Sequence, residues 1–137
     1  MHPSNTDAHY LALDIGEKRV GVAIASEKSR LARPLMTLPN DTNLITKIKE
    51  LTGEYNVQKI IVGLPKSLSG LPTNQTIITK SYMKKLKDEL RVEIDSEDEA
   101  LSSVRAEEEL KSRGKIFSKA EIDKLAACLI LEDYLNR

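Results

Sequence analysis

The chain has 137 residues, the usual size of one domain, and carries 21 Lys and Arg against 21 Asp and Glu. Hydrophobic residues make up 40% and charged residues 31%, which is typical of a globular protein with its own core and excludes a disordered chain. A formal net charge of zero argues against strong nonspecific binding of nucleic acid but leaves local basic patches open. Lys and Arg cluster in four stretches: Lys18-Arg19, Lys28–Arg30, Lys80–Lys87 and Lys111–Lys119.

The apolar stretches and the single cysteine predict the cellular location of the protein. No apolar run reaches the length of a membrane span, and MHPSNTDAH lacks the pattern of a secretory signal, so we expect a cytoplasmic protein without a membrane partner. The only cysteine, Cys128, lies in the apolar run LAACLIL and is expected to be a reduced thiol in the core. We expect a single domain over residues 1–137, with a flexible segment at residues 1–8.

The first predicted strand contains an unusual residue. Residues 10–15 are apolar on both faces, which is typical of a strand at the centre of a sheet. Asp14 lies inside this strand, and a buried carboxylate is strongly unfavourable unless it is paired, hydrogen-bonded or bound to a metal. Asp14 therefore needs a local partner or a chemical role.

Two further strands complete a predicted meander. Residues 16–18 are short enough for a hairpin turn, in which glycine tolerates a positive φ. Residues 20–25 return as the second strand, and Gly21 and Ala23 lie on a face of small residues, against which we expect the last helix to pack. Residues 31–38 form the third strand, and the proline within it restricts that strand to a sheet edge or a bulge.

Helices and strands alternate in the rest of the chain. Polar capping residues, apolar stripes at helical spacing and short apolar runs predict the following segments. They are a helix capped by Asn40 or Asp41 and running to Glu54, a strand at 57–62, a helix from Thr73 or Asn74 to Leu90, a strand at 91–94, a helix capped by Ser102 or Ser103 and ending at Gly114, and a helix at 119–135 capped by Ser118 with Glu121 in a capping box. This order predicts an α/β fold with a mixed five-stranded sheet flanked by helices.

Acidic residues stand at three places that such a fold can bring together. Asp14 is in the first strand, Asp98 and Glu99 close the last strand, and Asp123 lies in the first turn of the last helix. Carboxylates that converge raise one another's pKa, and Mg²⁺ or Mn²⁺ among their oxygens makes such a cluster tolerable. Two such ions about 4 Å apart are the usual clamp for in-line attack on a phosphodiester.

Spacing alone leaves another interpretation open. Asp14 could pair with Lys18 or Arg19, while the acids after the last strand are solvated turn residues. An acid in the first turn of a helix, such as Asp123, is also favoured by the helix dipole without any further role.

Four ordered blocks resemble the YqgF family, also called RuvX, of nucleases that are similar to Holliday junction resolvases. The blocks are DIGEKRVGVA at 14–23, IIVGLP at 60–65, DEALSSVRAEEEL at 98–110 and DKLAACLILEDYL at 123–135. The similarity covers essentially the whole chain after the first eight residues. It implies an RNase H-like fold, which agrees with the predicted order of elements, and a metal-dependent nuclease.

The resemblance also implies individual roles. The positions that match the metal-binding catalytic acids of the family are Asp14, Glu99 and Asp123, with Asp98 as an additional candidate. In the implied mechanism the first of these acids bridges two Mg²⁺ (or Mn²⁺) ions and the other two complete the ligand set. Lys18 and Arg19 match the basic pair of the family and are expected to contact substrate phosphates. Alternatively, Lys18 is a solvated hairpin tip and Arg19 holds Asp14 in position.

Other matched and unmatched positions are less informative. Gly63 and Pro65 match a turn beside the cleft, where we favour a conformational role, and Ser102 matches a hydroxyl that helix capping explains. Ala100 replaces the Arg that usually follows the acidic pair. The loops 66–70 and after Gly114 also depart from the family, the first by lacking its common Asn and the second by being shorter and less basic. These departures concern the grip on the substrate rather than the metal ligands.

Several functions remain open at this level. The resemblance implies trimming of the 5′ end of precursor 16S rRNA, with ribosomal precursor particles as partners, or resolution of branched DNA. An ATP-dependent kinase of the actin-like group also opens with a D-x-G strand, but that architecture needs two such domains and 137 residues supply one. A non-catalytic ribosome or transcription accessory factor with vestigial acids is the third possibility.

Overall fold

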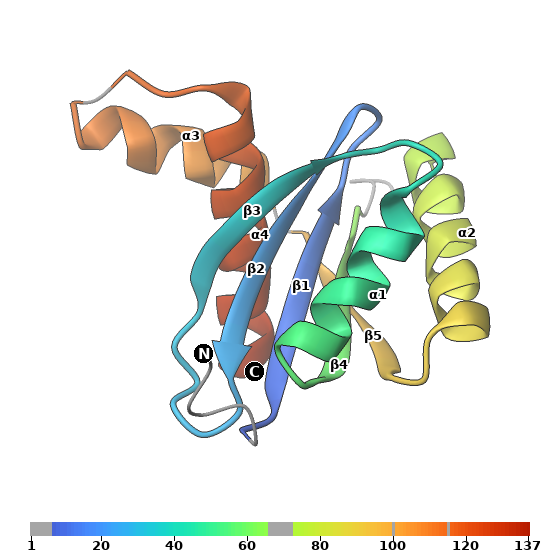
Figure 1. Cartoon of the computed structure of the whole chain (residues 1–137). Coiled ribbons are helices and arrows are strands. Elements are labelled where there is room, and N and C mark those ends of the chain that lie inside the picture. The colour runs from blue at the N-terminus through green and yellow to red at the C-terminus, as the bar shows by residue number, and fades with distance from the viewer. Residues whose placement is uncertain (1–6, 66–72, 100, 115) are drawn as a thin grey trace.

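A computed structural model describes the chain except for residues 1–6, 66–72, 100 and 115 (Figure 1). Part of the N-terminal segment expected to be flexible thus lies outside the described residues, as do Ala100 and the loop 66–70. The described elements are β1 His9–Ile15, β2 Arg19–Ser26, β3 Arg33–Pro39, α1 Leu44–Glu54, β4 Val57–Leu64, α2 Asn74–Glu89, β5 Glu93–Asp98, α3 Ser102–Ser112 and α4 Lys119–Leu135.

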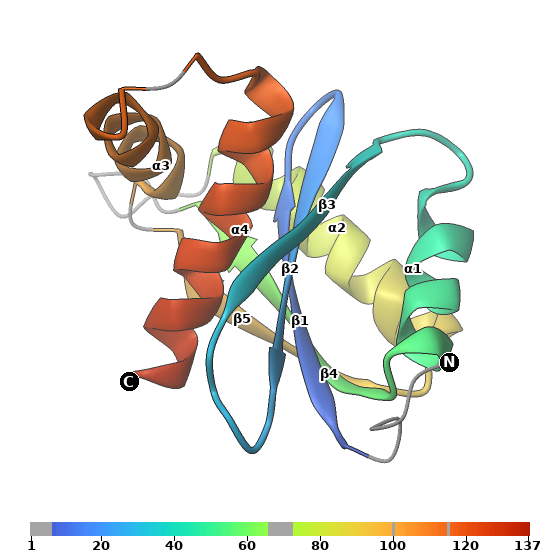
Figure 2. The same cartoon turned by 60° about the vertical axis from the view of Figure 1, so that its left-hand side comes forward.

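The strands form one mixed sheet in the order β3-β2-β1-β4-β5. The β1–β2 and β2–β3 pairs are antiparallel, whereas β1–β4 and β4–β5 are parallel. Helices α1 and α2 cover one face of the sheet, and α4 crosses the other face with α3 beside it (Figure 2). The predicted mixed five-stranded sheet flanked by helices is confirmed, with β1 at its centre.

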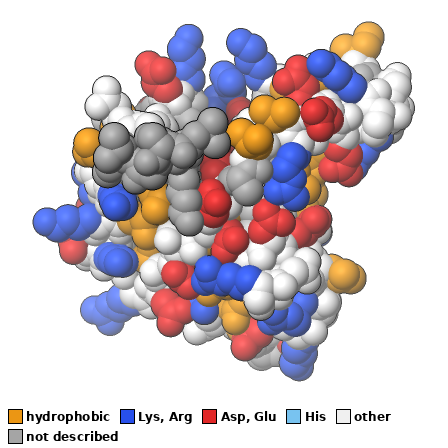
Figure 3. Space-filling model, turned by 180° about the vertical axis from the view of Figure 1, so that it is seen from behind, with side chains coloured by type: hydrophobic (Ala, Val, Ile, Leu, Met, Phe, Trp, Pro, Cys, Tyr) orange, Lys and Arg blue, Asp and Glu red, His pale blue; other side chains and the backbone are white. Residues whose placement is uncertain are grey.

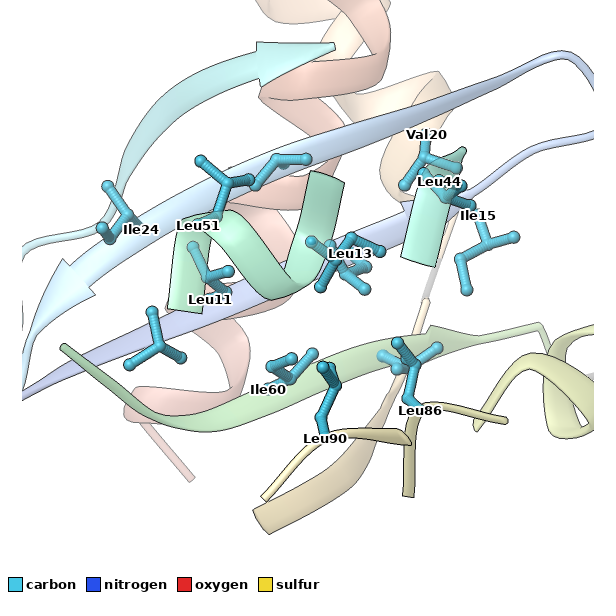
Figure 4. Close-up of a cluster of buried hydrophobic side chains, with 14 residues drawn as sticks. Leu11, Leu13, Ile15, Val20, Ile24, Leu44, Leu51, Ile60, Leu86 and Leu90 are labelled. Atoms are coloured by element: carbon cyan, nitrogen blue, oxygen red, sulfur yellow. The ribbon is translucent and has the colours of Figure 1, made fainter. Parts of the chain in front are cut away.

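Alternating side chains of β1 feed two separate cores. Leu11, Leu13 and Ile15 point into the larger core, which α1 and α2 complete with residues such as Leu51 and Leu86 (Figure 4). The intervening residues, including Ala12, point toward α4 and belong to the second core. Asp14 has the same parity as Ala12, so it lies on the α4 face.

The second core contains the cysteine. Cys128 of α4 is buried, as expected, and burial together with Glu132 raises the pKa of its thiol to about 12. The thiol therefore stays protonated at neutral pH and packs as a small apolar group. No helix in the described part of the chain is both long and apolar enough to cross a membrane.

The predicted helix starts are confirmed where the sequence holds a complete capping motif. Thr73 caps α2, and Ser118 caps α4 through the predicted capping box with Glu121. The other two predictions are wrong. Asn43 precedes α1 without a side-chain capping bond, and Leu101 precedes α3 in the left-handed conformation, with φ 59°.

The sheet differs from the prediction at two points, in β5 and at Gly16, and agrees with it in β3. β5 covers Glu93–Asp98 instead of residues 91–94, because its backbone pairs with β4 along the acidic stretch. β3 is an edge strand whose register shifts beside Pro34, as expected. Gly16 does not adopt a positive φ; a Cβ there would lie 2.8 Å from the carbonyl oxygen of Arg19, so the hairpin needs glycine for its close backbone approach.

Candidate active site

Asp14 is a buried carboxylate near the carboxyl end of β1. Its side chain is on the α4 face, the residue as a whole is 9% exposed, and its partner across the antiparallel β1–β2 pair is Gly21. Among the described residues, none donates a hydrogen bond to the Asp14 carboxylate or forms an ion pair with it. The structure therefore does not support the alternative in which Lys18 or Arg19 neutralises Asp14.

Gly21 brings the second acid to Asp14. Residues directly opposite in an antiparallel pair share one face of the sheet, so the missing side chain of Gly21 leaves a gap beside Asp14. α4 fills this gap with its own backbone. A Cβ on Gly21 would overlap the carbonyl of Asp123 and would lie 2.9 Å from the nitrogen of Lys124. The expectation that the last helix packs against Gly21 is thus confirmed.

Glu99 reaches the site from the end of β5. Its backbone N–H donates to the carbonyl oxygen of Leu64 at 3.2 Å, which continues the parallel β4–β5 ladder by one residue. By strand alternation Glu99 shares the α4 face with Glu97, whereas Asp98 shares the opposite face with its partner Leu64. The register therefore separates Asp98 from Asp14 across the sheet.

Burial and neighbouring acids raise the pKa of both Asp14 and Glu99. Burial, followed by the negative charges of Glu99 and Asp123, raises the pKa of Asp14 from 3.8 to about 7. The pKa of Glu99 is also raised, by burial and by the neighbouring Asp98. The charges of Glu99 and Asp123 thus act on Asp14, and these three acids are the ones that match the catalytic positions of the family. They come from the end of β5, the start of α4 and β1.

The two basic candidates behave differently. The Arg19 Nε donates to the Asp123 Oδ2 at 2.6 Å, and both side chains are partly buried. Arg19 therefore holds Asp123 rather than Asp14. Lys18 is exposed at the hairpin tip, and its carbonyl accepts a hydrogen bond from the backbone of Asn40 at 2.9 Å.

The acids suit a hard divalent cation by chemistry, although they are not drawn together around one. As the side chains stand, no three Asp, Glu, His or Cys residues in the described part of the chain are grouped tightly enough to hold a metal ion. Arg19 occupies one oxygen of Asp123, while Asp14 has no compensating cation. A buried, unneutralised carboxylate flanked by two others is the donor set that Mg²⁺ and Mn²⁺ prefer.

Gly63 and Ser102 have surroundings that differ from those expected from the sequence. Gly63 lies within β4 rather than in a turn, and a Cβ there would overlap the side chain of Ile130 in α4. Its role is therefore a close approach of helix to sheet, which a glycine inside an apolar strand can signal. Ser102 is completely buried in the first turn of α3, and its Oγ has no hydrogen-bond partner among the described residues.

The face that carries α4 shows acidic side chains near its middle, with lysines and arginines between them (Figure 3). The fold is RNase H-like. It resembles Thermus thermophilus RuvC, solved with a Holliday junction substrate, with a TM-score of 0.60 and 15% identity over 94% of both chains. A second structure of RuvC from that organism matches with a TM-score of 0.53 and 13% identity over 93% of both chains. Identities this low establish the RNase H-like fold alone.

Sequence comparison narrows the class to one family. The model of the family described as "RuvX: Holliday junction resolvase" matches residues 8–137, and the chain belongs to this family. A relative from Sulfurihydrogenibium sp. is 39% identical over 93% of this chain and 89% of its own length. One from Streptococcus uberis is 38% identical over 93% of this chain and 96% of its own length. Both bear the name "Putative pre-16S rRNA nuclease".

Proposed function

We propose that this protein is a metal-dependent nuclease that hydrolyses phosphodiester bonds at the 5′ end of precursor 16S rRNA. The observation that carries the proposal is Asp14, a buried carboxylate whose pKa is raised to about 7 with Glu99 and Asp123 beside it. A fold gains nothing from burying such a charge, whereas a cation site requires it. The names of the relatives supply the substrate. A substrate of this kind places the protein in the cytoplasm, with ribosomal precursor particles as partners.

Each residue has a distinct task in this proposal. Asp14, Glu99 and Asp123 would hold Mg²⁺ or Mn²⁺, which supplies Lewis-acid stabilisation of the charge that develops on the phosphate and activation of the attacking water. Arg19 fixes the orientation of Asp123 through its hydrogen bond at 2.6 Å. Lys18, exposed at the tip of the β1–β2 hairpin, contacts a phosphate of the bound strand.

The test is cleavage of a precursor 16S rRNA fragment that carries the unprocessed 5′ end. The wild-type protein should cut it with Mg²⁺ and not with EDTA, and Asp14→Asn should lose at least 100-fold in rate, since removing a metal ligand abolishes the cation site. Asp133→Asn is the matched control, because Asp133 lies near the C-terminal end of α4 and pairs with Arg105 of α3. Cleavage that ignores EDTA, or an Asp14→Asn variant with full activity, would refute the proposal.

Branched DNA is the second candidate substrate. The description of the family model and the resemblance to RuvC bound to a Holliday junction favour it. A four-way DNA junction in the same assay separates the two, because faster Mg²⁺-dependent cleavage of the junction than of the rRNA would reassign the substrate. If the wild-type protein cuts neither, the alternative of a non-catalytic accessory factor replaces both.

A further inference from the structure

Three of the four basic clusters in the sequence are engaged by the protein itself. In the hairpin cluster Arg19 binds Asp123, and in the second cluster Lys28 pairs with Asp7 at 3.5 Å. In the last cluster the i,i+4 ion pairs of α3 are Lys111 with Glu107 at 3.4 Å and Arg113 with Glu109 at 2.7 Å. Much of the positive charge in these clusters is thus already compensated.

The fourth cluster, on α2, is different. Its members are exposed and form no ion pair with any described acid: Lys80, Lys84, Lys85 and Lys87. These lysines extend from the middle of α2 to its last turn, which contains Lys87 and ends with Asp88 and Glu89. A neutral protein that gathers unpaired lysines on one helix presents a local site for anions.

Three of these lysines form a row with a cavity beneath it. Lys80, Lys84 and Lys87 are spaced at i, i+4 and i+7, so they lie along one face of α2, separated by about 6 Å and about 4.5 Å along the helix axis. Together with Met83 they line a cavity of about 330 Å³, whose other wall is formed by Leu64 and Ser96 of the sheet. We call these three residues the lysine row.

The cavity lies at the same end of the sheet as the candidate active site. Leu64, which lines it, accepts the backbone hydrogen bond of Glu99 at 3.2 Å. Glu99 faces α4, whereas the cavity is on the α2 side, and among the described elements the edge strand β5 lies between them. A polymer that crosses this edge can contact the acids and the lysine row together.

We propose that the lysine row binds the phosphate backbone of the RNA substrate a few nucleotides away from the bond that is cut. Charge complementarity carries this assignment, because a row of uncompensated ammonium groups matches a row of phosphates and selects no base. Ile77, 60% exposed and three residues before Lys80, adds an apolar contact for a ribose or base at the end of the row. This inference rests on the proposed nuclease function and assigns a new part of the surface to it.

The test compares two triple variants that remove the same charge. Lys80→Gln/Lys84→Gln/Lys87→Gln removes the lysine row, and the control replaces three lysines elsewhere by glutamine: Lys28, Lys47 and Lys111. Binding of a fluorescent single-stranded RNA is measured by anisotropy in EDTA over a salt series, with thermal unfolding to verify that both variants fold. The lysine-row variant should bind at least 10-fold more weakly, and its salt slope should fall by about 2, since each phosphate contact on a single strand contributes roughly 0.7.

The outcomes separate this proposal from the nuclease assignment. Equal affinities and salt slopes for both triple variants, or no RNA binding by the wild-type protein, would overturn the lysine row even if cleavage is metal-dependent. Row-dependent RNA binding by a protein that cuts nothing would keep the row and refute the nuclease. A loss confined to a labelled four-way DNA junction, with RNA binding unchanged, would overturn RNA as the occupant of this surface.

Discussion

Asp14 is the residue on which the proposed site depends, because its carboxyl group is buried without a compensating cation among the described residues. An aspartate has a pKa near 3.8 when solvated, and in the folded protein the pKa is about 7 through burial and the charges of Glu99 and Asp123. The folded state thus keeps a proton on Asp14 between these two pH values, where the unfolded chain has lost it. In the absence of a cation, raising the pH across this interval therefore destabilises the fold.

This linkage gives the first prediction. The free energy of unfolding of the metal-free protein should fall by about 4 kcal/mol between about pH 4 and pH 7, because each pKa unit corresponds to about 1.4 kcal/mol. Asp14→Asn removes this titration, so the variant should be more stable than the wild-type protein at pH 8 and similar to it near pH 4.

Urea unfolding in EDTA at a series of pH values measures the effect. Asp88→Asn, at the exposed end of α2, is the matched control and should follow the wild-type curve. If the free energies of unfolding of the wild-type protein and of Asp14→Asn change in parallel from pH 4 to pH 8, the pKa of Asp14 is not raised by folding.

At the scale of elements, the contact between α4 and the sheet sets the distance between the acids. The helix starts at the Ser118 capping box and lies on β2 where Gly21 has no side chain. Farther along, Ile130 of α4 fills the space that Gly63 leaves on β4. Two glycines on one face of the sheet, Gly21 of β2 and Gly63 of β4, thus allow the close approach of the helix that carries Asp123.

The second prediction compares these glycines. Gly21→Ala places a methyl group against the backbone of Asp123, so α4 must shift and cannot relieve the clash by a side-chain rotation. We expect a loss of about 1–3 kcal/mol in the free energy of unfolding together with at least a 10-fold loss in Mn²⁺ affinity. Gly63→Ala clashes with the side chain of Ile130 rather than with the backbone of α4, so it should lose stability while keeping most of the Mn²⁺ affinity.

Calorimetric titration with Mn²⁺ and urea unfolding distinguish the two effects. Gly53→Ala serves as a third variant, because nothing lies within 4 Å of its added Cβ in α1, and it should stabilise the protein by about 0.5–1 kcal/mol. Full Mn²⁺ affinity in Gly21→Ala would mean that the contact of α4 with Gly21 does not position Asp123.

Local and nonlocal signals explain what the sequence predicted. The start of α4 was predictable because Ser118 and Glu121 form a complete local motif. The extent of β5 was not, because EIDSED has few apolar residues and becomes a strand through its pairing with β4 and through ion pairs of Arg137 with Asp95 and Glu97. The left-handed Leu101 before α3 is equally nonlocal, since no residue type there favours a positive φ.

The candidate site shows the same division. The order of the elements already allowed Asp14, Glu99 and Asp123 to converge, but it left separate local roles open, and the resemblance to the family favoured the grouping. The fold explains that grouping, because a glycine on β2 admits α4 beside Asp14 and the β4–β5 ladder carries Glu99 to the same face. The alternative in which Arg19 holds Asp14 is wrong for a related reason. The carboxylate that Arg19 binds belongs to Asp123, which is 104 residues away in the sequence.

At the scale of the whole molecule, a cation at the site would join segments that are far apart in the chain. Asp14 belongs to β1, Glu99 follows β5 and Asp123 is on α4, so a bound cation would connect the sheet to the helix that covers it. A ligand that binds only the folded state stabilises it in proportion to the logarithm of its concentration. Metal binding should therefore be visible as global stability.

The third prediction follows from this linkage. Mg²⁺ at about 100 times its dissociation constant should stabilise the wild-type protein by about 2.7 kcal/mol and raise its melting temperature by several degrees at pH 7.5. Asp14→Asn should not respond. Thermal unfolding with a potassium salt at matched ionic strength corrects for screening, and an equal shift in the variant and the wild-type protein would assign the stabilisation to other sites.

The most direct measurement is a crystal structure of the wild-type protein with Mn²⁺, in which anomalous scattering locates the ion. We predict an anomalous peak bounded by the carboxylates of Asp14, Glu99 and Asp123, with the hydrogen bond from Arg19 to Asp123 retained. Ordered density with these three carboxylates pointing apart, or Mn²⁺ bound only at other residues, would contradict the central claim that they form one metal site.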